Sequence, residues 1–177
     1  TLENRTAVGS DGLWRSRLRY GAQHDAVNIQ ASMARLETDG YRDHSDTRRD
    51  TGSLRLGIDI DDASSLTLLF NALDQPDTQD PLGLTADQVR EDRRQAVAAS
   101  QTFDTRKSVR HQQSGLNYQR QLSNADQITL MVYGGTREVQ QFLAFPGADT
   151  FDEDGNLRPG SGGVIELDRR FGGAELG

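Results

Sequence analysis

A length of 177 residues, a net charge of −7 and the absence of cysteine exclude several classes of protein. Without cysteine there is no disulfide scaffold and no thiolate metal site. A pI near 4.9 argues against a nucleic-acid partner, because phosphate binding needs a basic face. No run of about 20 apolar residues could form a membrane-spanning helix, and the mean hydropathy is −0.71.

Apolar and polar residues alternate in one segment after another, which is the pattern of strands with one apolar face. The alternation is cleanest at 54–60, where Leu54, Leu56 and Ile58 oppose Arg55 and Gly57. The strands predicted in this way are 2–8, 14–20, 27–33, 54–60, 66–72, a less regular one at 116–118, 128–132 and 165–171. The sequence therefore predicts an all-β fold of about eight strands.

The connections between these segments alternate between short and long. They run over 9–12, 21–25, 41–47, 61–64, 75–105, 123–126 and 146–163. Segments 61–64 and 123–126 have the Asp, Asn and Ser residues of tight turns. Short turns at one rim and long loops at the other are typical of an up-and-down transmembrane barrel. We expect an antiparallel meander of neighbouring strands, with these two turns at the same rim.

A helix is predicted within the longest connection. Thr85 can cap it, Gln88 stands at the reciprocal capping-box position, and Leu84 can pack on Val89. The helix should run from Thr85 to about Ala99, and with little apolar surface it should lie outside any core.

In a barrel the two faces of each strand meet different surroundings, so mean hydropathy does not reveal the membrane. The apolar set is expected to face lipid: Leu54, Leu56, Ile58, Leu66, Leu68 and Phe70. Arg15, Arg17, Arg19 and Arg55 are expected to face the lumen. There they could guide an anionic ligand, or they could pair with acidic residues of neighbouring strands or of a plug inside the barrel.

Two stretches resemble the barrel of TonB-dependent outer-membrane receptors, the family that includes siderophore receptors. They are Glu37-Thr38-Asp39-Gly40-Tyr41-Arg42-Asp43-His44-Ser45 with Thr47-Arg48-Arg49, and Gly83-Leu84-Thr85 through Arg93-Arg94-Gln95 to Thr105-Arg106-Lys107. The likeness extends over nearly the whole chain. It implies a barrel of 22 strands closed around a plug domain, of which residues 1–177 would form roughly a third, with the plug absent from this chain.

The resemblance also implies a function. The family resides in the outer membrane of Gram-negative bacteria and takes up scarce small cargo, such as a ferric siderophore, with energy from TonB. Outer-membrane lipid and, through the missing plug, TonB are then the expected partners. The chain begins at Thr1 without an initiator Met, so we expect it to be a segment of a longer polypeptide.

A basic and aromatic cluster is the candidate ligand-binding site. Its members, which the resemblance places in an outer loop, are Tyr41, Arg42, His44, Arg48 and Arg49. Such side chains suit an anionic chelate, although solvated loop charge is the simpler interpretation. The three histidines, His24, His44 and His111, lack ligand spacing, so we expect no protein-bound metal.

Catalysis is not predicted. The sequence has no Gly-x-Ser-x-Gly elbow, no Cys/His pair and no His-x-x-x-His helix, and no cofactor is expected. Two alternatives to a receptor remain: a soluble β-sandwich binding module, which would bury its apolar faces against each other, and a barrel enzyme of the outer membrane.

Overall fold

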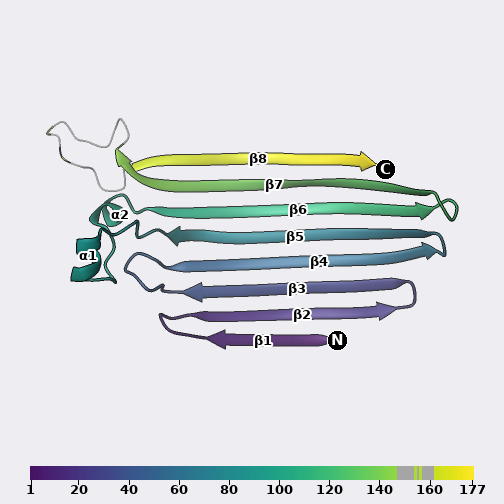
Figure 1. The fold of residues 1–177 in the computed structure, drawn as a ribbon, viewed down its shortest axis with the longest axis horizontal. Coiled ribbons are helices and arrows are strands. Elements are labelled where there is room, and N and C mark those ends of the chain that lie inside the picture. The colour runs from purple at the N-terminus through teal and green to yellow at the C-terminus, as the bar shows by residue number, and fades with distance from the viewer. Residues whose placement is uncertain (147–153, 155, 157–161) are drawn as a thin grey trace.

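Eight strands form one antiparallel sheet, and each strand pairs with its neighbour in the sequence (Figure 1). This computed structural model describes residues 1–146, 154, 156 and 162–177. The strands are β1 (Leu2–Val8), β2 (Trp14–His24), β3 (Val27–Thr38), β4 (Thr47–Asp61), β5 (Ser64–Gln79), β6 (Arg106–Gln121), β7 (Gln127–Pro146) and β8 (Gly162–Leu176). The predicted all-β meander is confirmed. Among the described residues no second sheet covers either face.

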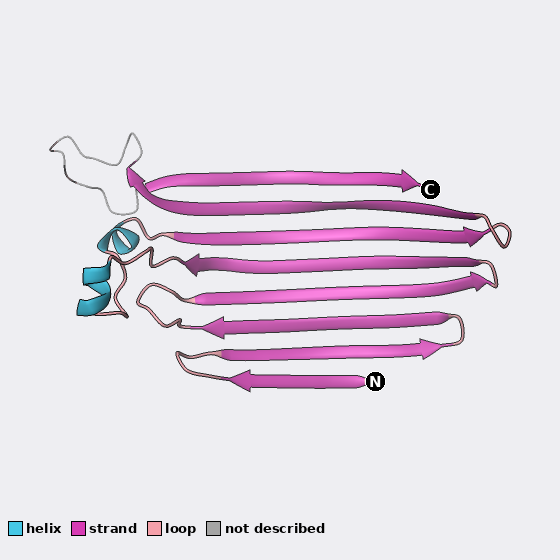
Figure 2. Cartoon of the chain, viewed as in Figure 1, coloured by secondary structure: helices cyan, strands magenta, loops and turns pink. Residues whose placement is uncertain are grey.

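Turns of two to five residues join the strands at one end of the sheet, and connections of five, eight and 26 residues join β1 to β2, β3 to β4 and β5 to β6 at the other end (Figure 2). The turns at Asp25, between Asp61 and Ser64, and between Ser123 and Asp126 share the first end, as predicted for the last two. The Asp61 carboxylate accepts a hydrogen bond from the Ala63 amide at 2.9 Å. The connection predicted at 146–163 lies largely outside the described residues.

Several strands extend further toward the long connections than predicted. β5 continues to Gln79, and Pro76 is accommodated at an irregularity between Gln75 and Thr78, where the ladder needs no amide donor. β2 extends in the opposite direction, toward the short turns, and continues to His24, so the turn predicted at 21–25 is shorter than expected. Where both faces of a strand are polar, hydrophobic alternation gives no signal.

The long connection from β5 to β6 contains two short helices, α1 (Ala86–Glu91) and α2 (Ala98–Thr102). Thr85 caps α1 as predicted: its amide donates to Gln88 Oε1 at 2.8 Å, and its hydroxyl accepts from the Gln88 amide at 3.3 Å. The predicted extent to Ala99 is wrong. The backbone at Asp92 is extended and its carboxylate accepts from the Arg94 amide at 2.8 Å, a local bond that competes with the helix.

One face of the sheet carries an apolar belt beside the short turns. Successive side chains alternate between faces, and the strand registers align the apolar ones across all the strands except the short β1. The apolar belt comprises Leu18, Tyr20, Ala22, Val27, Ile29, Ala31, Met33, Leu54, Leu56, Ile58, Leu66, Leu68, Phe70, Ala72, Leu116, Tyr118, Leu130, Val132, Ala174 and Leu176.

No member of the apolar belt is buried. Leu54 and Phe70 are each 40% exposed. Among the described residues only five are buried: Ser64, Ser100, Phe103, Thr105 and Val109. Large apolar side chains of a folded protein usually face a core. Of the set predicted to face lipid, Leu54, Leu68 and Phe70 are exposed, and Leu56, Ile58 and Leu66 are half-buried.

Beyond the apolar belt the same face becomes charged. Arg35 contacts Asp50 at 2.6 Å, Arg48 lies 3.4 Å from Asp50 and 3.8 Å from Asp74, and Arg110 lies 3.6 Å from Asp74 and also 3.6 Å from Glu138. We call these six residues the charge ladder. The surface thus changes from apolar to charged along β3 to β8, toward the long connections.

Replacing Thr85 with Ala is expected to fray α1 without disturbing the sheet. The change removes one half of the capping box, which should weaken the helix by about 1 kcal/mol. Amide hydrogen exchange of residues 86–91 should accelerate about fivefold, as that energy implies. Thr102→Ala is the control, because the Thr102 hydroxyl only donates back to the Ala98 carbonyl. Equal acceleration in both variants would contradict the role of the cap.

Candidate functional site

The long connections at one end of the sheet are hydrogen-bonded into a single unit, which we call the loop cap (residues 9–13, 39–46 and 80–105). The Asp39 amide donates to the Asp11 carbonyl at 3.0 Å. The Asp43 amide donates to the Arg94 carbonyl at 2.8 Å. Three segments that are distant in sequence therefore hold one another in place.

Arg42, a predicted ligand-binding residue, is the main tie within the loop cap. Its Nε donates to the Gln95 carbonyl at 2.9 Å, Nη1 to the Leu82 carbonyl at 2.5 Å and Nη2 to the Pro81 carbonyl at 3.0 Å. A guanidinium has five N–H donors in a fixed fork, so most of this capacity is used on the backbone. Its position favours a structural role over direct capture of an anion.

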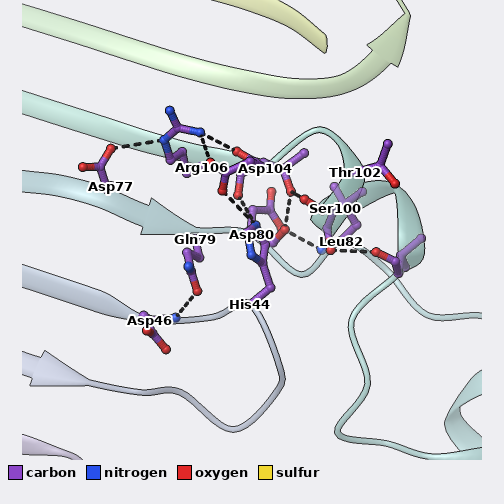
Figure 3. Close-up of polar contacts among 12 residues, drawn as sticks. His44, Asp46, Asp77, Gln79, Asp80, Leu82, Ser100, Thr102, Asp104 and Arg106 are labelled. Carbon is purple, nitrogen blue, oxygen red and sulfur yellow. Dashed lines mark hydrogen bonds and ion pairs between the residues drawn. The ribbon is translucent and has the colours of Figure 1, made fainter. Parts of the chain in front are cut away.

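His44 lies at the base of the same loop (Figure 3). Its Nε2 is 2.9 Å from the Thr105 carbonyl oxygen, and its side chain is only 11% exposed. Thr105 in turn donates its hydroxyl to the Asp80 carbonyl at 2.5 Å. Arg106 closes the base through ion pairs to Asp104 and to Asp77, the latter at 3.3 Å. His44 thus belongs to a network that fixes where the loop leaves the sheet.

Tyr41 faces outward. Its side chain is 48% exposed, and the Arg94 guanidinium lies over the ring at 4.8 Å from the ring centre. Arg94 also forms an ion pair with Asp11 at 2.7 Å. Tyr41 is thus the member of the predicted cluster that the loop cap leaves accessible, and its basic neighbour is Arg94, which was not predicted.

Arg48 and Arg49 are neighbours on β4 and therefore point to opposite faces of the sheet. Arg48 belongs to the charge ladder on the apolar-belt face, whereas Arg49 donates to Gln75 Oε1 at 2.8 Å on the other face. The five predicted ligand-binding residues therefore do not converge on one site. Sequence proximity grouped side chains that the strand separates.

The face opposite the apolar belt is basic, and we call it the basic face. Outside the irregularities at Asp61 and Asp77 it carries nine basic and three acidic side chains, whereas the apolar-belt face carries six of each. The basic ones are Arg5, Arg15, Arg17, Arg19, Arg49, Arg55, Lys107, Arg137 and Arg169; the acidic ones are Glu3, Asp59 and Glu175.

All four arginines predicted to share a polar face lie on this basic face. The sequence analysis missed Lys107, Arg137 and Arg169, which extend it over β6 to β8. Alternation counted from the neighbouring apolar residues of those strands could have found them. Within the described part of the chain, Arg15, Arg17, Arg19 and Arg55 form no ion pair within 4.0 Å with a carboxylate.

Like charges even face each other on this surface. Arg5 on β1 is directly opposite Arg17 on β2, an arrangement that destabilises an antiparallel pair. Arg5 forms an ion pair with Glu3, which leaves Arg17 uncompensated.

A shallow groove of about 560 Å³ crosses the basic face. Arg19 and Arg55 lie on its lining together with the polar side chains of Gln30 and Asn71 and the carboxylate of Glu3. The hydroxyls of Ser32 and Ser53 also line it and are 2.8 Å apart. The groove thus offers mainly hydrogen-bond donors, which suits a carboxylate.

Metal ligands do not gather in the described residues: no group of three or more His, Asp or Glu side chains could hold an ion. No helix among the described residues is long and apolar enough to cross a membrane. No family model matches the sequence.

Substituting Arg42 with Gln should loosen the loop cap. The variant loses charge-assisted bonds to three carbonyls, which we expect to lower the free energy of loop opening by about 2 kcal/mol. Limited proteolysis by trypsin, whose sites Arg90, Arg93 and Arg94 lie in this loop, should become roughly 30-fold faster. Cleavage is scored at these three sites, so Arg93→Gln, which removes one of them, is unsuitable as a control. Arg120→Gln removes the same charge outside the loop cap and should leave the rate unchanged.

Replacing Arg17 with Glu should stabilise the chain. The new carboxylate would face Arg5 and turn a like-charge pair into an attractive one, worth about 0.2–1 kcal/mol. Urea unfolding in detergent micelles measures the change. Arg55→Glu is the control, since Arg55 faces Gln30 and Leu69 rather than a basic residue. A lower urea midpoint for Arg17→Glu than for the unchanged chain would contradict the conclusion that the Arg17 charge is uncompensated.

Proposed function

We propose that this chain is part of the membrane-spanning barrel of an outer-membrane receptor of the TonB-dependent type. The observation that carries the proposal is the apolar belt, which occupies the short-turn part of one face of a single-layer sheet and has no buried member. In water such a surface is a liability, whereas in a bilayer it is the surface that contacts lipid.

The dimensions of the apolar belt support this assignment. From Val27 to Met33 it extends about 20 Å, at about 3.4 Å per residue, near the height of about 25 Å of a barrel's lipid-facing band. On the loop-cap side the apolar belt ends at Met33 on β3 and at Ala174 on β8. The β8 residue in register with Met33 is Arg170, so the end of the belt shifts by four residues between β3 and β8. That is a slant of about 13 Å over about 24 Å of sheet. Barrel strands tilt in this way against the membrane.

The basic face then borders the lumen, and the loop cap lies outside the cell with the short turns at the periplasmic rim. The charge ladder falls where the strands leave the hydrocarbon. Under this proposal the barrel continues to 22 strands around a plug, which receives energy from TonB. The cargo is a scarce small molecule such as a ferric siderophore, and Tyr41 with Arg94 offers an outward aromatic and basic surface for it.

A soluble β-sandwich binding module is the competing function. It would need a second layer over the apolar belt, and no residue of the described chain supplies one. The edges of β1 and β8 also pair with no strand among the described residues. A barrel that continues beyond both strands satisfies these edges.

A flotation experiment separates the two functions. The urea-unfolded chain is diluted into phosphatidylcholine vesicles and centrifuged through a density gradient. We expect it to float with the vesicles and to resist extraction by carbonate. A chain that remains as a soluble monomer without vesicles or detergent would overturn the membrane assignment.

Leu56→Lys should reduce the floating fraction sharply. A lysine in the middle of the lipid-facing band costs about 2–4 kcal/mol, and Leu56 lies in the central part of the apolar belt on β4. The matched control is Thr67→Lys, which places the same charge on the basic face of β5. Equal loss in both variants would contradict the division into a lipid face and a lumen face.

A further inference from the structure

We propose that the basic face binds an acidic polypeptide segment, which lies in extended conformation along β2 and reaches Arg55 on β4. This inference rests on the proposed function only in that a barrel encloses the face. It names the chemistry of the occupant: carboxylates presented by a peptide, rather than a small anion or water alone.

The charge of the basic face calls for such an occupant. Its nine basic side chains outnumber the three acidic ones. Two of the basic side chains contact a partner side chain: Arg5 forms an ion pair with Glu3, and Arg49 donates a hydrogen bond to Gln75. Most of the other acidic residues that the structure describes lie in the turns and connections, outside the strands. Compensation must therefore come from outside the sheet.

Position makes the compensation more valuable. Tyr20, Leu54 and Leu56 belong to the apolar belt. Arg19 precedes Tyr20 in the sequence, and Arg55 lies between Leu54 and Leu56. The guanidinium groups are thus at the level of the hydrocarbon, across the thickness of one sheet. Unpaired charges lose solvation in such surroundings and gain more from a partner than they would in bulk water.

The spacing of the arginines favours a peptide. Arg15, Arg17 and Arg19 occupy alternate positions on one strand, so neighbours are about 6.8 Å apart along β2. An extended segment with acidic residues at alternate positions repeats the same interval and can meet all three. A small anion can bridge two of them at most.

The groove provides the rest of the binding surface. Arg19 and Arg55 flank the Ser32 and Ser53 hydroxyls, and Gln30 and Asn71 add amide donors. These neutral groups can bond the carboxylates and the peptide backbone without adding charge. Glu3, which is directly opposite Arg19 in the strand register, forms its ion pair with Arg5 and none within 4.0 Å with Arg19 or Arg55 among the described residues.

The test measures peptide binding by the chain in dodecyl maltoside micelles. The probe is a fluorescent octapeptide with Glu and Thr in strict alternation. We expect Arg19→Gln/Arg55→Gln to weaken its binding about tenfold. Arg120→Gln/Arg170→Gln removes two charges from the other face, where neither residue forms an ion pair within 4.0 Å in the described chain. This control should leave affinity unchanged. Raising the salt from about 0.05 M to 0.5 M should also weaken binding, because screening shortens the reach of the charges.

Two further probes decide between occupants. An octapeptide of the same composition with its Glu residues in adjacent pairs should bind more weakly than the alternating one. Tricarballylate, a small tricarboxylate, should bind more weakly than either peptide. Tricarballylate binding as tightly as the alternating peptide, or equal affinity of the unchanged chain and Arg19→Gln/Arg55→Gln, would overturn the inference. A chain that floats with vesicles and fails this test overturns the inference alone, whereas a chain that does not float overturns the proposed function.

Discussion

A sheet of a single layer has nothing of its own against which to bury an apolar face. In this chain the backbone satisfies itself through next-neighbour ladders, but the apolar belt is left without a protein partner in the described residues. The hydrophobic effect that normally drives a core together must here act between the sheet and its surroundings. The location of every charge follows from that condition, because charges are excluded from the apolar belt and collect elsewhere.

Three zones result along and across the same strands. The apolar belt lies beside the short turns, the charge ladder continues the same face toward the loop cap, and the basic face lies behind both. In the charge ladder Arg48 and Arg110 each contact two carboxylates, so that region is neutral without help. On the basic face the charges have few partners. One sheet therefore presents a face suited to lipid, a margin suited to water and a back suited to an acidic partner.

Sequence alone predicted the strands wherever one face is apolar, as between Leu54 and Ile58, because alternation is visible only there. It missed the loop-cap halves of β4 to β7, and in β4 to β6 the reason is that most side chains on both faces are polar, so the strand looks like a loop. It also recognised the capping box at Thr85, which depends on residues three apart. The role of Arg42 was out of reach, since its carbonyl partners at Pro81, Leu82 and Gln95 lie 39 to 53 residues away.

The separation of charge has a consequence for how such a sheet enters a membrane. The basic face carries a net charge of +6 and the apolar-belt face a net charge of 0. Since the whole chain carries −7, the remaining residues carry −13. In a bilayer the long, acidic connections and the turns would lie on opposite sides, so one set has to cross the hydrocarbon. Carrying charge through that layer is very costly. Insertion would be slow unaided, and removal would have to carry the same charges back across the hydrocarbon, so a kinetic barrier would oppose passage in both directions.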